Sequence, residues 1–227
     1  MLNGMTTPPT DDRSLPLRER KRLRTRRALA DTALRMFTEK GFEATTLDEL
    51  VEEVEVSKST FFRAFPAKEA VGIEAEAELW SAYLARLRER TLSGMVLGEL
   101  HQCLVEAVTV LDSGWDERYV ATRRLVLVAP PLLAYLGHHR VRVENQVIAC
   151  LGEGLGLDPD DLRIHVLAQL TTTCWSVAAR DWVHHDAQGG RDALLRRLDR
   201  AYRSVPASLQ LAAPQDASPA GREPRST

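Results

Sequence analysis

The sequence predicts an all-α protein with a small N-terminal three-helix domain and a larger helical region behind it. Apolar residues recur at helical spacing along most of the chain, whereas no stretch shows sustained period-two alternation rich in β-branched residues. Turn-forming residues separate the helical stretches, as at Asp112-Ser113-Gly114 and Gly189-Gly190. The 227 residues are 44% apolar and 27% charged, so the chain can bury a sizeable core.

Four segments are expected along the chain. Residues 1–15 and 207–227 are rich in residues typical of disorder, the first in Thr, Pro and Asp and the second in Pro, Ala and Ser. The three-helix domain is expected over residues 16–70 and the larger helical domain over residues 71–206.

The composition favours a cytoplasmic protein that makes no membrane contact. The N-terminus lacks the apolar stretch of a signal peptide. The longest apolar run, Leu125–Leu136, contains two prolines and is too short to span a bilayer. The three cysteines are widely spaced and odd in number, which favours reduced thiols over a disulfide framework.

Capping signals set the limits of the first three helices. The first is expected over Leu17–Lys40, with Gly41 as a left-handed residue after its end. Thr46 begins the second, where a T-x-x-E capping box pairs it with Glu49. Ser57 is a good N-cap for the third, which should stop before the proline at position 66.

Six more helices are expected in the larger region. They are placed at about Ala67–Leu92, Glu99–Leu111, Asp116–Val128, Pro130–Leu155, Asp160–His185 and Arg191–Val205. The glycines of residues 152–156 follow a helix rather than a strand, so a helix end explains them better than a phosphate-binding loop.

The third helix has two faces of different character. Phe61 and Phe65 are four residues apart and share one face, where they can pack on the two preceding helices. The opposite face carries Lys58, Ser59, Thr60, Phe62 and Arg63. Small residues let a helix start approach phosphate, and a guanidinium fork is suited to a guanine edge or a phosphate. This arrangement is typical of a helix that enters the DNA major groove.

A cluster of basic residues precedes this helix pair. Its members are Arg18, Arg20, Lys21, Arg22, Arg24, Arg26 and Arg27. Because the net charge of the chain is −2, nucleic-acid binding would depend on this local patch. Two alternatives stay open: the basic residues form an ordinary solvated face, or they bind an acidic protein partner.

Residues 26–71 resemble the N-terminal domain of TetR-family transcriptional regulators. They read RRALADTALRMFTEKGFEATTLDELVEEVEVSKSTFFRAFPAKEAV and end in an F-P-x-K-E-x motif at Phe65–Ala70. The resemblance implies an all-α homodimeric regulator, usually a repressor, that releases a palindromic operator when a small molecule binds its C-terminal domain.

The resemblance also assigns DNA contacts residue by residue. Thr46 falls where the cap of the second helix meets a phosphate, and Lys68 where a lysine touches the DNA backbone. The full set expected to contact DNA is Arg26, Thr46, Ser57, Lys58, Ser59, Thr60, Phe62, Arg63 and Lys68. Three residues depart from the family pattern: Glu55 replaces a turn glycine, Phe62 a tyrosine, and Ala64 a larger polar residue.

A homodimer interface is implied for the last two long helices, Asp160–His185 and Arg191–Val205. The first carries an apolar stripe of Leu162, Val166, Leu167, Leu170 and Cys174, and the second one of Leu194, Leu195, Leu198 and Tyr202. The alternative is that both stripes belong to the core of the monomer.

A small-molecule site is expected between the middle helices, where helical bundles often bind ligands. Candidate lining residues are Trp115, Tyr119, Tyr135, Gln169, Thr172, Thr173 and Trp175, although residues of this kind are more often plain core than ligand wall. Their character predicts an apolar or aromatic effector.

No cofactor, metal site or catalytic centre is predicted. Adjacent histidines on a helix diverge by about 100°, so His138-His139 and His184-His185 are poorly placed to share one ion. The sequence also lacks a phosphate-binding glycine loop and a G-x-S-x-G nucleophile motif. An α-helical enzyme is therefore the least favoured of the possible functions.

Overall fold

The computed structural model describes residues 16–212, and all regular structure in that range is α-helical. The predicted all-α fold is confirmed. Four helices form an N-terminal head: α1 (Leu17–Lys40), α2 (Leu47–Glu53), α3 (Lys58–Ala64) and α4 (Lys68–Gly72). The body is built from α5 (Glu74–Glu89), α6 (Val96–Val110), α7 (Trp115–Val128), α8 (Pro130–Leu155), α9 (Leu162–His184) and α10 (Gly190–Ser208). Of the segments expected to be disordered, residues 1–15 and 213–227 lie outside the described range. The expected start of the C-terminal tail at residue 207 is wrong, because α10 continues through Ser208.

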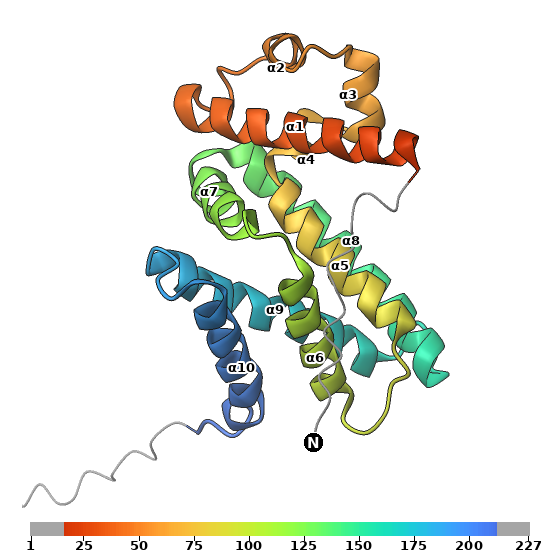
Figure 1. Ribbon diagram of the computed structural model, residues 1–227. Helices are drawn as coiled ribbons and strands as arrows, with labels where there is room; N and C mark the ends of the chain where they lie inside the picture. The colour runs from red at the N-terminus through yellow and green to blue at the C-terminus, as the bar shows by residue number, and fades with distance from the viewer. Residues whose placement is uncertain (1–15, 213–227) are drawn as a thin grey trace, which may run out of the picture.

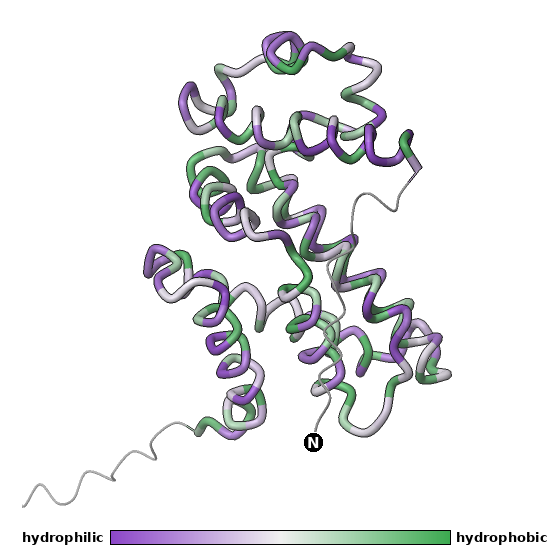
Figure 2. Tube along the Cα trace, viewed as in Figure 1, coloured by the Kyte–Doolittle hydropathy of each residue, from purple (hydrophilic) through white to green (hydrophobic). Residues whose placement is uncertain are grey.

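The head lies across one end of the body. Figure 1 shows α1 above the ends of α5, α7 and α8, with α9 and α10 at the opposite end of the molecule. The apolar core of the head also contains Leu125, Val126, Ala129 and Leu132 from the corner between α7 and α8. Figure 2 shows this apolar corner directly beneath α1. The head is therefore packed against the body through a shared core.

The prediction of one long helix over residues 67–92 is wrong, because the chain bends at Ile73 between α4 and α5. A Cβ atom on Gly72 would lie 2.7 Å from a terminal methyl group of Leu132, so a larger residue would require the Leu132 side chain to shift. Ile73 is buried in the core of the head. The bend lets α4 stay with the head while α5 runs into the body.

Two glycines end helices in different ways. Gly156 after α8 is left-handed, with φ 64° and ψ 33°, which confirms that the glycine-rich segment is a helix end. Gly41 after α1 also has a positive φ of 90°, but its ψ of 154° makes it extended rather than left-handed helical. The chain therefore leaves α1 abruptly toward α2.

No single helix within residues 16–212 is both long and apolar enough to cross a bilayer. The helices α7 and α8 pass such a test only as a pair, and they are bent by 116° with respect to each other.

Candidate nucleic-acid interface and aromatic core

A capping box begins α2. The Thr46 hydroxyl accepts a hydrogen bond from the Glu49 amide at 3.2 Å, and the Glu49 carboxylate accepts one from the Thr46 amide at 2.8 Å. These bonds from Thr46 lower the pKa of the exposed Glu49 carboxyl. Thr46 is itself exposed, so its side chain lies at the surface, as its predicted role requires.

The turn between α2 and α3 is a Schellman motif with glutamate in the position that favours glycine. The Val56 amide donates to the Val51 carbonyl at 2.9 Å and the Glu55 amide to the Glu52 carbonyl at 3.0 Å. Glu55 has a φ of 54°. The turn therefore keeps the left-handed geometry although its residue carries a Cβ.

Glu55→Gly is expected to raise the free energy of unfolding by about 1 kcal/mol, because glycine removes the strain at positive φ. The measurement is the urea midpoint of the full chain. Glu52→Gly is the matched control, since an exposed helical glutamate replaced by glycine should lower stability by about 1 kcal/mol. Equal losses in both variants would contradict the strain.

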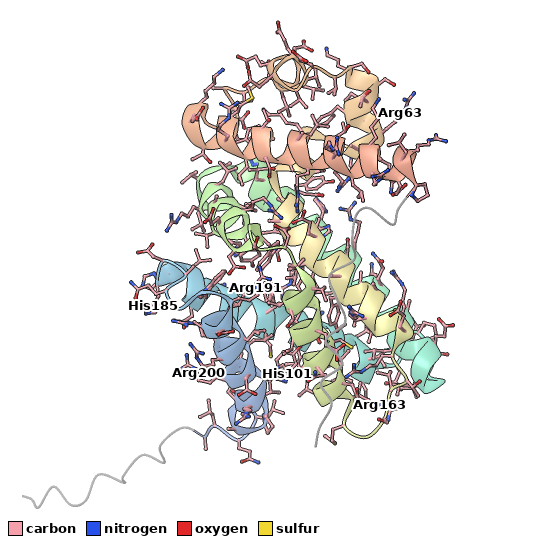
Figure 3. All side chains as sticks on the ribbon, in the orientation of Figure 1. Arg63, His101, Arg163, His185, Arg191 and Arg200 are labelled. Atoms are coloured by element: carbon pink, nitrogen blue, oxygen red, sulfur yellow. The ribbon has the colours of Figure 1, made fainter. Side chains whose placement is uncertain are left out.

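Helix α3 is anchored through one face. Phe61 and Phe65 are buried in the core of the head, and Ser57 caps the helix by accepting from the Thr60 amide at 3.1 Å. The opposite face is exposed: Phe62 is 54% accessible, and Arg63 points outward (Figure 3). The described structure thus presents this polar face of α3 to solvent.

Lys58 and Ser59 are also exposed on α3, and Thr60 is half-buried. The Lys58 ammonium lies 2.5 Å from a carboxylate oxygen of Asp48 on α2. Both side chains are more than half exposed, so this ion pair contributes little stability and a phosphate could replace the carboxylate.

Two residues predicted to contact DNA, Arg26 and Lys68, bind other residues of the protein instead. The Arg26 guanidinium forms a bidentate ion pair with Glu74 at 2.5 Å, donates to the Ala64 carbonyl, and stacks 4.2 Å from the centre of the Phe65 ring. The Lys68 ammonium donates to the Phe42 carbonyl at 2.5 Å. Burial lowers the pKa of Lys68 and raises that of Glu74. Neither of these two side chains is therefore part of the exposed basic surface around α3.

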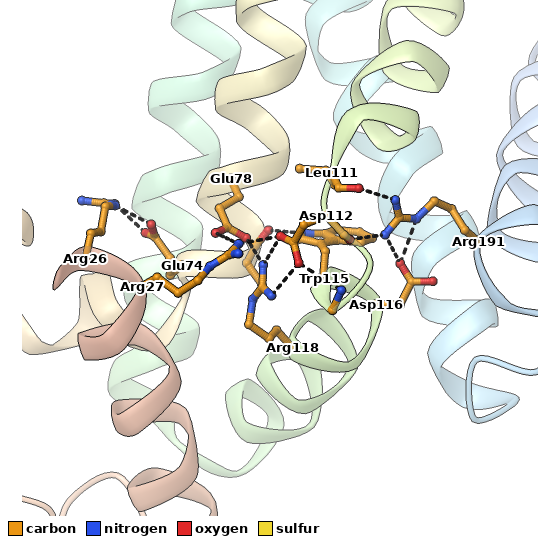
Figure 4. A network of polar contacts seen from close by, with 12 residues as sticks. Arg26, Arg27, Glu74, Glu78, Leu111, Asp112, Trp115, Asp116, Arg118 and Arg191 are labelled. Atoms are coloured by element: carbon orange, nitrogen blue, oxygen red, sulfur yellow. Dashed lines mark hydrogen bonds and ion pairs between the residues drawn. The ribbon is translucent and has the colours of Figure 1, made fainter. Parts of the chain in front are cut away.

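Ion pairs join the head to the body at a junction network made of Arg27, Glu78, Asp112 and Arg118 (Figure 4). Asp112, in the turn between α6 and α7, lies 2.5 Å from Arg27 of α1 and 2.8 Å from Arg118 of α7. Arg118 also pairs with Glu78 of α5 at 2.8 Å. Arg27 thereby bonds the head to the turn before α7, and Arg118 links that turn to α7 and α5 of the body.

The same turn is bonded to α10. Arg191 donates to the carbonyls of Leu111 and Asp112 at 2.6 and 2.7 Å, and pairs with Asp116 at 2.6 Å. A continuous series of polar contacts therefore runs from the start of α10 to α1.

Asp112→Asn is expected to lower the melting temperature at neutral pH. Hydrogen bonds from Arg118 and then Arg27 hold the folded-state pKa of Asp112 well below its ordinary value. Their stabilisation is present above the unfolded pKa and is lost as pH falls through the folded pKa. Because the Asp112 side chain is 36% exposed, the substitution should lower the free energy of unfolding by only about 1 kcal/mol.

The check on Asp112 is a series of melting curves from neutral to acidic pH. The difference between wild type and Asp112→Asn should shrink below about pH 4, where the carboxyl begins to protonate in the unfolded chain. Asp160→Asn, on an exposed turn, is the control. A difference that stays constant with pH would rule out the ionised carboxylate as its source.

Three of the predicted ligand residues meet in the body. Trp115, Tyr119 and Trp175 are buried, and the Trp175 indole donates to the Tyr119 hydroxyl at 3.0 Å. Trp80 and Trp182 complete what we call the aromatic cluster, with ring centres 6.3 Å from Trp175 and Tyr119, respectively. The aromatic cluster connects α5, α7 and α9.

The other four predicted ligand residues lie elsewhere. Tyr135 packs against the core of the head, and Gln169 and Thr173 are exposed on α9. Thr172 is buried but donates to Glu144 at 2.7 Å. The structure does not bring these four side chains to the aromatic cluster.

Sequence reasoning missed Glu76, which is buried beside this cluster. Its carboxylate accepts from the Trp80 indole at 3.0 Å. The signal was present in the sequence, because Glu76 is three, four and seven residues before Leu79, Trp80 and Tyr83 and so shares the apolar face of one helix.

The two predicted interface stripes have different surroundings. Leu194, Leu198 and Tyr202 of α10 are buried in the core of their own chain, so the monomer-core alternative is correct for them. On α9, Leu162 and Val166 are exposed at 77% and 55%, whereas Leu167 and Leu170 are half-buried and Cys174 is buried. Leu162, Val166 and, further along, Val177 therefore form an exposed apolar strip on α9, which the exposed Gln169 and Thr173 interrupt.

An exposed recognition helix, held by a tight turn and bonded to a larger helical body, defines a helix–turn–helix DNA-binding regulator. Residues 29–75 match the family model described as bacterial regulatory proteins, tetR family. The HTH-type transcriptional regulator TcmR of Streptomyces glaucescens is 34% identical over 193 residues, which are 78% of this chain and 81% of TcmR. The chain belongs to the TetR family of transcriptional regulators, whose members are not enzymes.

Two further similarities have narrower or weaker support. The negative regulator IcaR of the biofilm operon icaADBC, from Staphylococcus aureus strain Newman, is 26% identical over 40% of this chain and 50% of IcaR. A solved structure of the fatty acid degradation regulator FadR from Bacillus halodurans is 17% identical, with a TM-score of 0.48 over 83% of this chain and 97% of FadR.

Proposed function

We propose that the protein is a homodimeric repressor that binds a palindromic operator and releases it when a small molecule enters the body. The exposed polar face of α3 carries this proposal. Phe61 and Phe65 fix the helix from behind, and Arg63 and Ser59 face outward. A helix held in this way fits the width of the major groove and can present its side chains to base edges.

The exposed strip on α9 supports a dimer. Leu162, Val166 and Val177 lie within a narrow angular range on the helix, and all three are more than half exposed. Burying such a strip against a second copy would remove apolar surface from water. Two copies would place two α3 helices on one palindromic site.

The contacts between head and body support control by a ligand. Helix α5 bonds α1 through Glu74 and lies in the aromatic cluster through Trp80. A molecule that binds the aromatic cluster therefore acts on the helix that also holds the head. The name of IcaR as a negative regulator favours repression over activation.

The test is a gel-shift series on the DNA upstream of the protein's own gene, at several salt concentrations, with random DNA of equal length for comparison. The upstream DNA should bind at least about a thousandfold more tightly at physiological salt. Equal affinity for both DNAs would overturn the proposal and favour an acidic protein as the partner of the basic helix.

A further inference from the structure

We infer that Phe62 reads sequence in the operator and that it recognises the C5-methyl group of a thymine in the major groove. This inference rests on the proposed function, because it names the base feature that one side chain of α3 selects. Phe62 is 54% exposed, and among the described residues of α3 it is the one exposed apolar side chain. Its ring therefore lies on a surface that is otherwise polar.

The Phe62 ring is supported from behind by the core of the head. Its centre lies 5.4 Å from the centre of the Phe61 ring, and the two planes meet at 89°, the edge-to-face arrangement that aromatic pairs favour. Phe61 is itself fully buried in that core. A supported ring loses little conformational freedom when it meets a partner, so the burial of its exposed surface adds affinity.

Phe62 lies on the flank of the DNA-binding face rather than at its centre. Arg63 and Ser59 point away from the core, because each is about 160° around the helix from the buried Phe61. Phe62 is only about 100° from Phe61. When Arg63 points toward the floor of a groove, the ring of Phe62 therefore points toward one wall.

The chemistry of the ring limits what it can recognise there. A phenylalanine side chain has neither a donor nor an acceptor, so it cannot form a hydrogen bond with a phosphate or a polar base edge. In the major groove, the apolar group that distinguishes one base pair from another is the thymine methyl group. This group lies at the outer edge of the base pair, beside the backbone, whereas the acceptors of guanine lie nearer the middle. The flank position of Phe62 therefore suits a thymine methyl group, and the position of Arg63 suits a guanine.

The sugars of the backbone also offer apolar surface at the groove wall, but they are the same at every base pair. A ring packed on a sugar would add affinity without sequence preference. Uracil separates the two arrangements, because it pairs with adenine as thymine does and lacks only the methyl group. Loss of one buried methyl group should weaken binding about fourfold, and its loss from both half-sites of a palindrome about fifteenfold.

The experiment starts from duplexes that the full chain selects out of a random-sequence pool. Each thymine of the selected half-site is then replaced by uracil in turn, and fluorescence anisotropy gives the affinity of the wild type and of Phe62→Ala. In the wild type, one replacement should cause the fourfold loss, and the same replacement in both half-sites the fifteenfold loss. In Phe62→Ala that replacement should leave the affinity unchanged, because the methyl group has already lost its contact.

Leu133→Ala is a control matched in exposure. Leu133 is 55% exposed on α8 of the body, and Phe62 is 54% exposed on α3. This variant should show the same loss with uracil as the wild type. Melting temperatures are measured for both variants, and Phe62→Ser provides the same test if Phe62→Ala does not fold.

Two results would overturn the inference while leaving the proposed function in place. One is a selected site that lacks thymine or whose thymines can all be replaced by uracil without loss of affinity. The other is a uracil effect that persists at every position in a Phe62→Ala variant with a wild-type melting temperature. A pool from which no sequence is enriched would instead count against the proposed function, and the inference would fall with it.

Discussion

Val166→Asp is expected to convert the protein into a monomer and to weaken operator binding by about a hundredfold or more. Val166 lies on the exposed apolar strip of α9. In a twofold interface the same substitution occurs on both copies, so two carboxylates would be buried against apolar surface near each other. The monomer would then bind one half-site without the added affinity that a second, linked α3 helix provides.

Light scattering gives the mass and gel shifts give the affinity of this variant. Val141→Asp is a control matched in exposure, because Val141 is 54% exposed on α8 and Val166 is 55% exposed on α9. The control should keep both the dimer mass and the operator affinity. A Val166→Asp variant with dimer mass would show that the interface lies elsewhere.

Local signals in the sequence were sufficient to predict the helix limits and caps of the head. The limits of α1 match the prediction at both ends, and the Thr46 and Ser57 caps form the predicted hydrogen bonds. The turn at Glu55 has a positive φ although glutamate replaces the turn glycine of the family pattern. Each of these features depends on residues within one or two helical turns, which is the range over which sequence patterns are informative.

The features that were not predicted depend on contacts between distant segments. Beside the break between α4 and α5, Gly72 packs against Leu132, which lies 60 residues further along the chain. An apolar stripe has the same spacing whether it faces its own core or a second copy, so the burial of Leu194 and Leu198 could not be read from α10 alone.

At the candidate site, the sequence likewise does not show whether a basic residue is free to bind DNA or is paired with a carboxylate of the same chain. Arg26 is one of several arginines on α1, and only the fold shows that its partner is Glu74, 48 residues away. The basic cluster is therefore divided. Arg26 and Arg27 hold the head on the body, whereas other members such as Arg24 are exposed. Arg63, on α3 and outside the cluster, is exposed, and within residues 16–212 no carboxylate lies within ion-pair distance of it.

Arg63→Ala is expected to reduce discrimination between the operator and a site with one altered base pair by about 1–3 kcal/mol, which is up to a hundredfold. The exposed guanidinium projects from a helix whose other face is fixed by Phe61, so it can be held against one base edge. The measurement is a competition gel shift in which each base pair of the half-site is altered in turn.

Lys68→Ala separates base reading from phosphate binding. The family resemblance assigns Lys68 a phosphate contact, which requires its ammonium to leave the Phe42 carbonyl. On that assignment its loss should weaken all sites alike and reduce the slope of log affinity against log salt by about one. Its ammonium also lies 4.1 Å from the centre of the Phe42 ring, so the melting temperature must be followed in parallel. If Lys68→Ala changed the order of preferred sites and Arg63→Ala did not, the two roles would be reversed. The face of α3 would then position the protein, and the start of α4 would read the sequence.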